Sequence, residues 1–157
     1  MIYIVDTSVF RTLFRHFYET RFPSLWENIN KLVADGRLVS VREVIREVQV
    51  FGKEDRLLKW VKDNSVLFQT PTEEEIACVQ AIFKNHHFQA NIERIKMLEG
   101  GPVADPFLVA KAKALKGTVV TQEEYKPNGV KIPNICEFMH VKCTNLEGLM
   151  EVEKWVF

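Results

Sequence analysis

The chain has 157 residues, of which 46% are hydrophobic and 27% are charged, and this ordinary globular composition excludes extended disorder, collagen and coiled coil. Lys and Arg number 21, as do Asp and Glu, so the formal net charge is zero and a strongly basic nucleic-acid coat protein is excluded. A chain of this length is typical of one domain, and we expect a single domain over residues 1–157.

The location of the protein is indicated by its apolar segments and its cysteines. No stretch reaches the roughly 18 apolar residues of a membrane span. The first residues lack the basic lead and apolar core of a signal peptide. Cys78, Cys136 and Cys143 include no Cys-x-x-Cys pair, which is typical of buried thiols in a reducing compartment. We therefore expect a soluble, cytoplasmic protein without a membrane partner.

Two hydrophobic patterns alternate along the chain: short apolar runs, typical of strands buried on both faces, and apolar residues at helical spacing. The first half is expected to form a strand at 2–5, helices at 9–17 and 24–36, a strand at 38–41, helices at 44–51 and 57–61, and a strand at 66–68. The second half is expected to form helices from 72, at 92–98 and at 105–115, a strand at 118–121, a loop at 127–133, a strand at 141–143 and a helix at 146–155. This alternation predicts an α/β fold with a parallel sheet covered on both faces.

Acidic residues recur near the ends of the expected strands. Ligands of open α/β sheets bind beyond the carboxyl ends of the strands, so these side chains are expected to converge there. Converging carboxylates repel one another and favour a bound divalent cation, and their oxygen atoms select Mg²⁺ or Mn²⁺ rather than zinc. The acids in these places are Asp6, Glu43, Glu47, Asp105, Glu123 and Glu124.

Each acid also has an ordinary interpretation. Asp105 before Pro106 is a natural N-cap of a helix, and Asp6 could cap the first helix in the same way. Helical phase favours Glu47 at the edge of the apolar stripe and directs Glu43 to solvent, where a surface ion pair is expected. The metal interpretation therefore depends on the joint pattern of the acids.

Four short motifs of the chain resemble the PIN-domain nuclease family: Ile-Val-Asp-Thr-Ser at 4–8, Glu47, Ala-Asp-Pro-Phe-Leu-Val-Ala at 104–110, and Val-Val-Thr-Gln-Glu at 119–123. The resemblance implies a three-layer α/β/α sandwich with a five-stranded parallel sheet. It also implies hydrolysis of RNA phosphodiester bonds that depends on Mg²⁺ or Mn²⁺. The positions that it matches to catalytic acids and metal ligands are Asp6, Glu47, Asp105 and Glu123, with Ser8 and Thr121 in support. Glu123 stands where the family usually has Asp, and whether it or Glu124 completes the site stays open.

Many small members of this family are toxins of toxin–antitoxin pairs. The resemblance therefore implies an antitoxin protein, and a second copy of the chain in a homodimer, as partners beside the RNA substrate. The alternative is a catalytically silent PIN-like module that binds RNA or a partner protein.

Cationic and aromatic residues near the expected site could contact the substrate. Arg11 and Arg15 lie four residues apart on the first helix, where they share a face. Lys126 and Lys131 flank the loop after Glu123, with Tyr125 available to stack on a base. These side chains are interpreted either as substrate contacts or as ordinary solvated charges, and both interpretations stay open.

Overall fold

The computed structural model describes residues 1–51, 54–99 and 103–157. The described residues form one five-stranded sheet in the order β3-β2-β1-β4-β5, and every pair of neighbouring strands is parallel. The strands are β1 (Tyr3–Val5), β2 (Leu38–Val41), β3 (Phe68–Gln69), β4 (Thr118–Val120) and β5 (Lys142–Thr144). The central strand β1 pairs Ile4 with Val39 on one side and with Val119 on the other.

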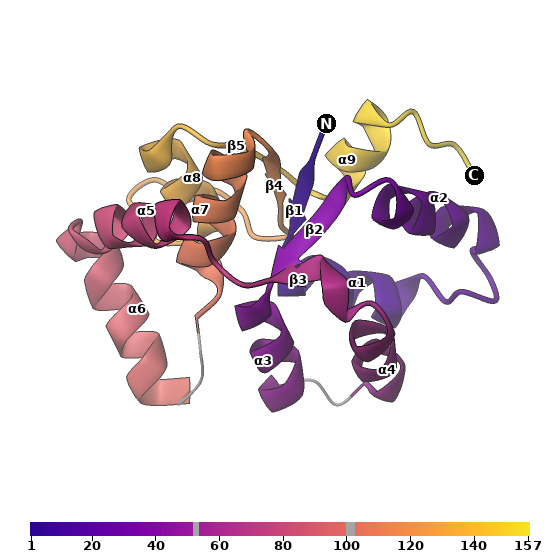
Figure 1. Ribbon diagram of the computed structural model, residues 1–157, viewed down its shortest axis with the longest axis horizontal. Helices are drawn as coiled ribbons and strands as arrows, with labels where there is room; N and C mark the ends of the chain where they lie inside the picture. Colours follow the sequence, from indigo (N-terminus) through magenta and orange to yellow (C-terminus); the bar gives the residue numbers. More distant parts are fainter. Residues whose placement is uncertain (52–53, 100–102) are drawn as a thin grey trace.

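Helices cover both faces of this sheet (Figure 1). On one side lie α5 (Glu73–Phe83), α7 (Asp105–Leu115) and α8 (Ile132–Met139), and on the other α1 (Thr7–His16), α2 (Pro23–Ala34), α4 (Asp55–Asp63) and α9 (Leu146–Val152). Two helices, α3 (Arg42–Phe51) and α6 (His86–Glu99), extend past the carboxyl ends of the strands. The predicted three-layer α/β/α sandwich with a five-stranded parallel sheet is confirmed.

The sequences of the strands are continuous apolar runs because the strands are buried in the core. Every residue of β1, β2 and β4 is buried, and Ile4, Val41 and Val119 have no measurable exposure. A strand with helices on both faces has no solvent side, so alternation of polar and apolar residues is absent. Within residues 1–51, 54–99 and 103–157, no helix combines the length and apolar character needed to cross a membrane.

Four stretches differ from the expectation. The helix expected at 92–98 is longer, because α6 begins at His86, and the last helix ends at Val152 rather than at 155. Residues 65–67 form a 3₁₀ turn, and the third strand is displaced to Phe68–Gln69. Residues 127–133 were expected to form a loop, but α8 begins at Ile132, with Pro133 as its second residue. Proline at the start of a helix loses no hydrogen bond, because the first N–H groups have no partner within the helix. The Pro and Asn residues near the start of α8 are therefore compatible with the helix.

Candidate active site

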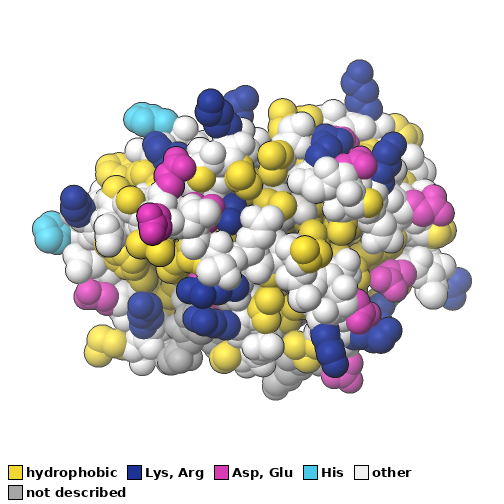
Figure 2. All heavy atoms as spheres, in the orientation of Figure 1, with side chains coloured by type: hydrophobic (Ala, Val, Ile, Leu, Met, Phe, Trp, Pro, Cys, Tyr) yellow, Lys and Arg dark blue, Asp and Glu magenta, His cyan; other side chains and the backbone are white. Residues whose placement is uncertain are grey.

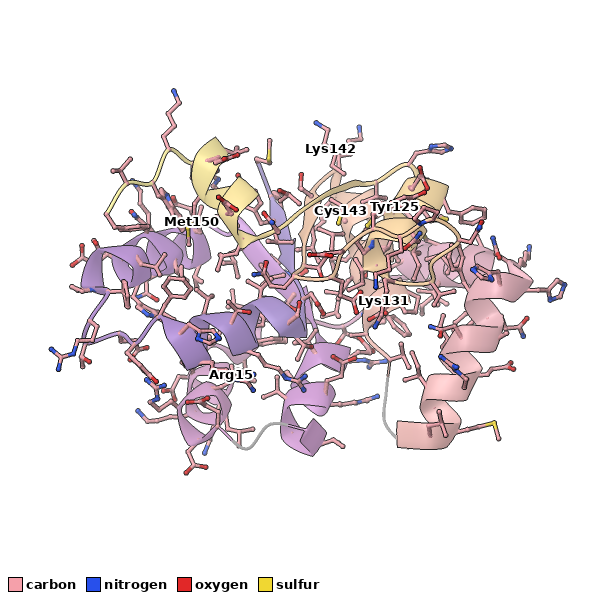
Figure 3. The ribbon with its side chains drawn as sticks, turned by 180° about the vertical axis from the view of Figure 1, so that it is seen from behind. Arg15, Tyr125, Lys131, Lys142, Cys143 and Met150 are labelled. Atoms are coloured by element: carbon pink, nitrogen blue, oxygen red, sulfur yellow. The ribbon has the colours of Figure 1, made fainter. Side chains whose placement is uncertain are left out.

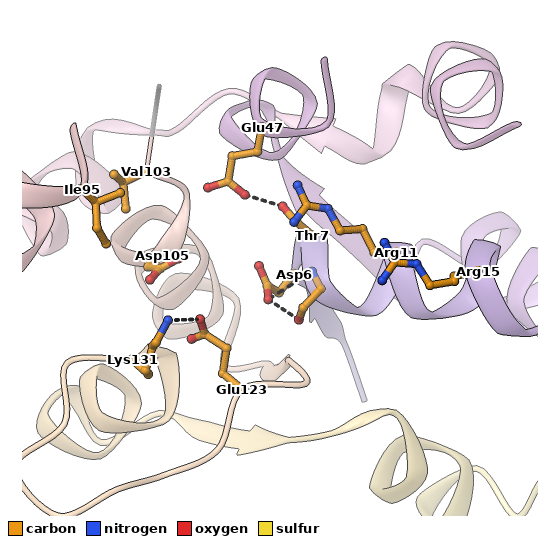
Figure 4. A pocket seen from close by; sticks show the side chains of 11 residues that line it. Asp6, Thr7, Arg11, Arg15, Glu47, Ile95, Val103, Asp105, Glu123 and Lys131 are labelled. Atoms are coloured by element: carbon orange, nitrogen blue, oxygen red, sulfur yellow. Dashed lines mark hydrogen bonds and ion pairs between the residues drawn. The ribbon is translucent and has the colours of Figure 1, made fainter. Parts of the chain in front are cut away.

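A cavity of about 530 Å³ lies at the carboxyl edge of the sheet. The four acids that the motifs indicate all line it, from four separate segments of the chain (Figure 4). These acids are Asp6 between β1 and α1, Glu47 on α3, Asp105 at the start of α7, and Glu123 in the segment after β4. Strand β1 lies between β2 and β4 in the parallel sheet, so the segments that leave the carboxyl ends of these strands converge at one edge.

Asp6 is oriented by two hydroxyl groups. Its Oδ2 accepts hydrogen bonds from Ser8 Oγ and from Thr121 Oγ1, the latter at 2.9 Å. The same atom accepts the Ser8 N–H at 3.3 Å, so Asp6 is also the N-cap of α1. The capping and the cavity interpretations of Asp6 are therefore compatible. Ser8 lines the cavity, and Thr121 is buried behind Asp6.

Glu47 connects three elements around the cavity. One of its carboxylate oxygens accepts a hydrogen bond from Thr7 Oγ1, and the other accepts the Ala104 N–H at 2.9 Å. The placement of Glu43 in solvent was wrong, because Glu43 is only 3% exposed and pairs with Arg42 Nε at 2.9 Å. Residues four apart lie on one side of a helix, and in α3 that side faces the protein at both positions. Glu43 does not line the cavity, whereas Glu47 does.

Asp105 is the first residue of α7, and the N-cap is Ala104. The expectation that Asp105 itself caps the helix was therefore wrong by one residue, with Pro106 at the second position. A carboxylate in the first helical turn interacts favourably with the positive end of the helix dipole. The helix does not use the Asp105 side chain as its cap, and this side chain lines the cavity instead.

Glu123 rather than Glu124 belongs to this cavity. Glu123 Oε2 accepts the Ile132 N–H at 2.9 Å, and Oε1 lies 3.3 Å from Lys131 Nζ. The longer side chain of Glu thus reaches the start of α8 from the cavity wall. Glu124 is exposed and lines a neighbouring cavity of about 400 Å³.

Burial and neighbouring negative charge oppose the ionisation of three acids in the cavity. Burial raises the pKa of Asp105 well above its usual range, and the charges of Glu123, Asp6 and Glu47 raise it further while Lys131 lowers it. Burial also raises the pKa values of Asp6 and Glu47, against the hydrogen bonds that each accepts from hydroxyl groups. Ionising Asp6, Glu47 and Asp105 together is therefore costly unless positive charge enters the cavity.

The donor set fits a hard divalent cation. Carboxylate and hydroxyl oxygens line the cavity, and oxygen donors of this kind are the ligands of Mg²⁺ and Mn²⁺. Within the described part of the chain, however, no group of three or more His, Cys, Asp or Glu side chains is arranged to hold a metal ion. The four acids share one cavity, and the carboxylates of Asp6, Glu47 and Glu123 are engaged in hydrogen bonds with the chain itself.

Cationic side chains stand around the acids. Arg11 and Arg15 of α1 line the cavity, as does Lys131, the residue before α8 (Figure 4). Figure 3 shows Arg15 and Lys131 within the whole molecule. Tyr125 lines the neighbouring cavity, which shares Glu123 with the first, and exposed Lys126 lines neither of these two. Over the face shown in Figure 2, positive and negative side chains are interspersed, as the zero net charge suggests.

Three residues of the cavity were not identified from the sequence. Thr7 follows Asp6 directly, and its place in the motif at residues 4–8 is the one signal that could have indicated its contact with Glu47. Ile95 of α6 and Val103 also line the cavity. Apolar residues in these positions have no sequence feature that separates them from ordinary core residues.

These features define the class of the protein: an α/β/α sandwich with a parallel sheet and an acidic cavity at its carboxyl edge. Residues 3–157 match the family described as "Domain of unknown function (DUF4411)", and the chain belongs to this family. No curated protein matches the chain in sequence.

Among solved structures, a similar chain occurs in the "Crystal structure of VapBC2 from Rickettsia felis bound to a DNA fragment from their promoter". The two chains are 14% identical with a TM-score of 0.50, over 92% of this chain and 98% of that one. At this identity the similarity shows a shared fold alone.

Proposed function

We propose that the protein is an endoribonuclease that depends on Mg²⁺ or Mn²⁺ and acts as the toxin of a toxin–antitoxin pair. The observation that carries this proposal is the convergence of four acids from distant segments on one cavity with cationic side chains at its rim. The convergence opposes ionisation of Asp6, Glu47 and Asp105, and perturbed acids gathered in a cavity are typical of a functional site.

The acids that would hold the ion are Asp6, Glu47, Asp105 and Glu123. When bound, a divalent ion lowers the pKa of a water molecule and offsets negative charge on the phosphoryl oxygens in the transition state. Ser8 and Thr121 fix the orientation of Asp6 through their hydroxyl groups. Asp105 lines the cavity beside the other acids, so its carboxylate is also placed to orient the attacking water.

The substrate phosphates are expected to lie along α1. Arg11 and Arg15 are one helical turn apart, a separation of about 6 Å along the helix axis. Both line the cavity, so each guanidinium can bind a phosphate next to the acids. Because the chain has no net charge, these local contacts have to supply the attraction for RNA.

Cleavage of a labelled single-stranded RNA tests the activity. The wild type is expected to cut it with Mg²⁺ or Mn²⁺ and to stop when EDTA is added, whereas Asp6→Asn is expected to be inactive under all conditions. Equal cleavage by the wild type and by Asp6→Asn, purified in parallel, would identify a contaminating nuclease and remove the support for this proposal.

The toxin role is supported by the fold shared with a chain of the VapBC2 complex. We expect expression of the wild type alone to arrest growth, and expression of Asp6→Asn at the same level to be harmless. Growth arrest by both proteins would mean that the toxicity does not depend on Asp6 in the cavity. Harmless expression of an RNA-cleaving wild type would contradict the toxin role while leaving the nuclease in place.

A catalytically silent RNA-binding module is the second candidate. It is favoured by one observation: the carboxylates as they stand form no ready-made ligand set for a metal ion within the described residues. If this function is correct, the wild type and Asp6→Asn bind RNA equally and neither cleaves it. Binding of Mn²⁺ to the wild type is measured in the same buffer as a control.

A further inference from the structure

The acidic cavity contains a positive charge supplied by the chain itself. Lys131 Nζ lies 3.3 Å from Glu123 Oε1, and Lys131 lines the same cavity as the four acids (Figure 4). Its charge also acts on a second acid, since it lowers the pKa of Asp105 against the three carboxylates that raise it. One ammonium group thus offsets charge on two walls of the cavity.

Lys131 acts at an acid whose two carboxylate oxygens are both engaged. The Ile132 N–H donates to Glu123 Oε2 at 2.9 Å, next to the ion pair with Lys131. Both partners belong to the first residues around the start of α8. These contacts direct Glu123 toward α8, which is consistent with the absence of a ready-made group of three metal-binding side chains among the described residues.

Lys131 forms an ion pair with an acid of the cavity, whereas Arg11 on the opposite wall forms none with Glu47 among the contacts of the described residues. Arg11 lowers the pKa of Glu47 through its charge, but the oxygens of Glu47 are held by the neutral Thr7 hydroxyl and the Ala104 N–H. A neutral donor does not repel an incoming cation, whereas an ammonium group at the carboxylate does. The Lys131 side chain is 57% exposed, and the stem of a lysine has several rotatable bonds, so its ammonium group has room to move away from Glu123 Oε1.

We infer that Lys131 is the internal counter-cation of the acidic cavity, holding Glu123 while no divalent ion is bound and competing with that ion for the Glu123 carboxylate. This inference rests on the proposed function, because it assigns the control of metal affinity at the proposed site. Lys131 is a positioning residue. It is expected to stabilise the metal-free protein and to lower the affinity for the divalent ion.

Titration with Mn²⁺ tests the inference. The titration compares four proteins by calorimetry at fixed ionic strength: the wild type, Lys131→Met, the conservative Lys131→Arg, and Lys126→Met, which removes an exposed lysine of the same segment outside the cavity. We expect Lys131→Met to bind Mn²⁺ about three- to tenfold more tightly than the wild type, because a repelling charge is removed at a partly screened site. Lys131→Arg and Lys126→Met are expected to bind like the wild type.

Thermal unfolding in EDTA gives an independent readout. Lys131→Met is expected to melt at a lower temperature than the wild type without metal, because the acids lose their counter-charge, and to gain more from saturating Mn²⁺. In the Glu123→Gln background the cost of Lys131→Met in EDTA is expected to shrink, since the ion pair is already absent.

The outcomes separate the two proposals. Equal or weaker Mn²⁺ binding by Lys131→Met than by the wild type overturns the counter-cation inference and leaves the nuclease proposal in place. Tighter binding by Lys126→Met of the same size also overturns it, because the effect would then come from net charge. No binding of Mn²⁺ by any of the four proteins overturns the proposed metal site, and the inference with it.

Discussion

Glu47 accepts a hydrogen bond from the Ala104 N–H at 2.9 Å, so the acid of α3 is bonded to the residue that precedes Asp105. These two residues are 57 positions apart in the chain. The second oxygen of Glu47 accepts from Thr7, which directly follows Asp6. Through Glu47, three of the four acids of the cavity are held in a fixed relation by contacts of the chain itself.

The contrast between Glu47 and Glu43 gives the first prediction. Glu47→Gln is expected to lower RNA cleavage by about 100-fold or more, because the change removes a carboxylate that would hold the metal ion. Glu43→Gln, four residues away on the same helix, is expected to stay within about threefold of the wild type, since Glu43 pairs with Arg42 outside the cavity. Comparable losses in the two variants would mean that the cavity is not the site of cleavage.

The second prediction separates the two roles of Asp6. Asn is as good an N-cap as Asp, so Asp6→Asn is expected to keep the capping of α1. Burial raises the pKa of Asp6, so replacing the charge by a neutral amide is expected to leave the melting temperature unchanged or higher in EDTA. Circular dichroism melting of both proteins measures this. A clear loss of stability in Asp6→Asn would attribute its inactivity to misfolding.

The third prediction concerns pH and follows from the direction of the shifts. The folded state raises the pKa values of Asp6, Glu47 and Asp105, so between the unfolded and folded values it binds more protons than the unfolded chain. Stability from these groups is therefore present at low pH and is lost as the pH rises through the folded values.

Chemical denaturation in EDTA between about pH 5 and about pH 8 measures this linkage. The free energy of unfolding of the wild type minus that of Asp105→Asn is expected to fall as the pH rises. Saturating Mn²⁺ is expected to reverse this fall near neutral pH, because the ion binds the ionised acids. A difference that increases with pH in EDTA would contradict the electrostatic description of the cavity.

The fourth prediction concerns the support of α7. Lys111 of α7 and Glu75 of α5 form a buried ion pair at 2.9 Å, and Lys111 Nζ also donates to Gln69 at 3.2 Å. Lys111→Met leaves the Glu75 charge buried without its cation and is expected to cost about 3–5 kcal/mol of the free energy of unfolding. Adding Glu75→Gln is expected to recover part of this loss, as urea denaturation can measure. A single variant as stable as the wild type would disprove this role.

Much of the fold could be predicted because its signal is local. The buried strands around Ile4, Val39 and Val119 are short apolar runs, and strands covered on both faces need such runs. The capping box of Thr72 and Glu75 is likewise present at the start of α5, since both partners lie within one turn. The four acids could be placed at one edge because the carboxyl ends of parallel strands share that edge.

What could not be predicted depends on contacts between distant segments. The start of α8 has the Pro and Asn residues of a turn, and so the Ile132 N–H that holds Glu123 was not foreseen. The inward direction of Glu43 depends on how α3 packs at the end of the sheet, which helical phase alone does not determine. In both cases the acid itself was identified from the sequence, but the residue that it contacts was not.

The most direct measurement of the metal site is the anomalous difference density of a crystal soaked in Mn²⁺. We expect an ion inside the cavity, coordinated by Asp6 and Asp105 and by at least one of Glu47 and Glu123, with Glu123 turned from Lys131 if it is a ligand. Density for Mn²⁺ only outside the cavity, or none at a concentration that saturates RNA cleavage, would contradict the assignment of these acids as the metal site of a nuclease.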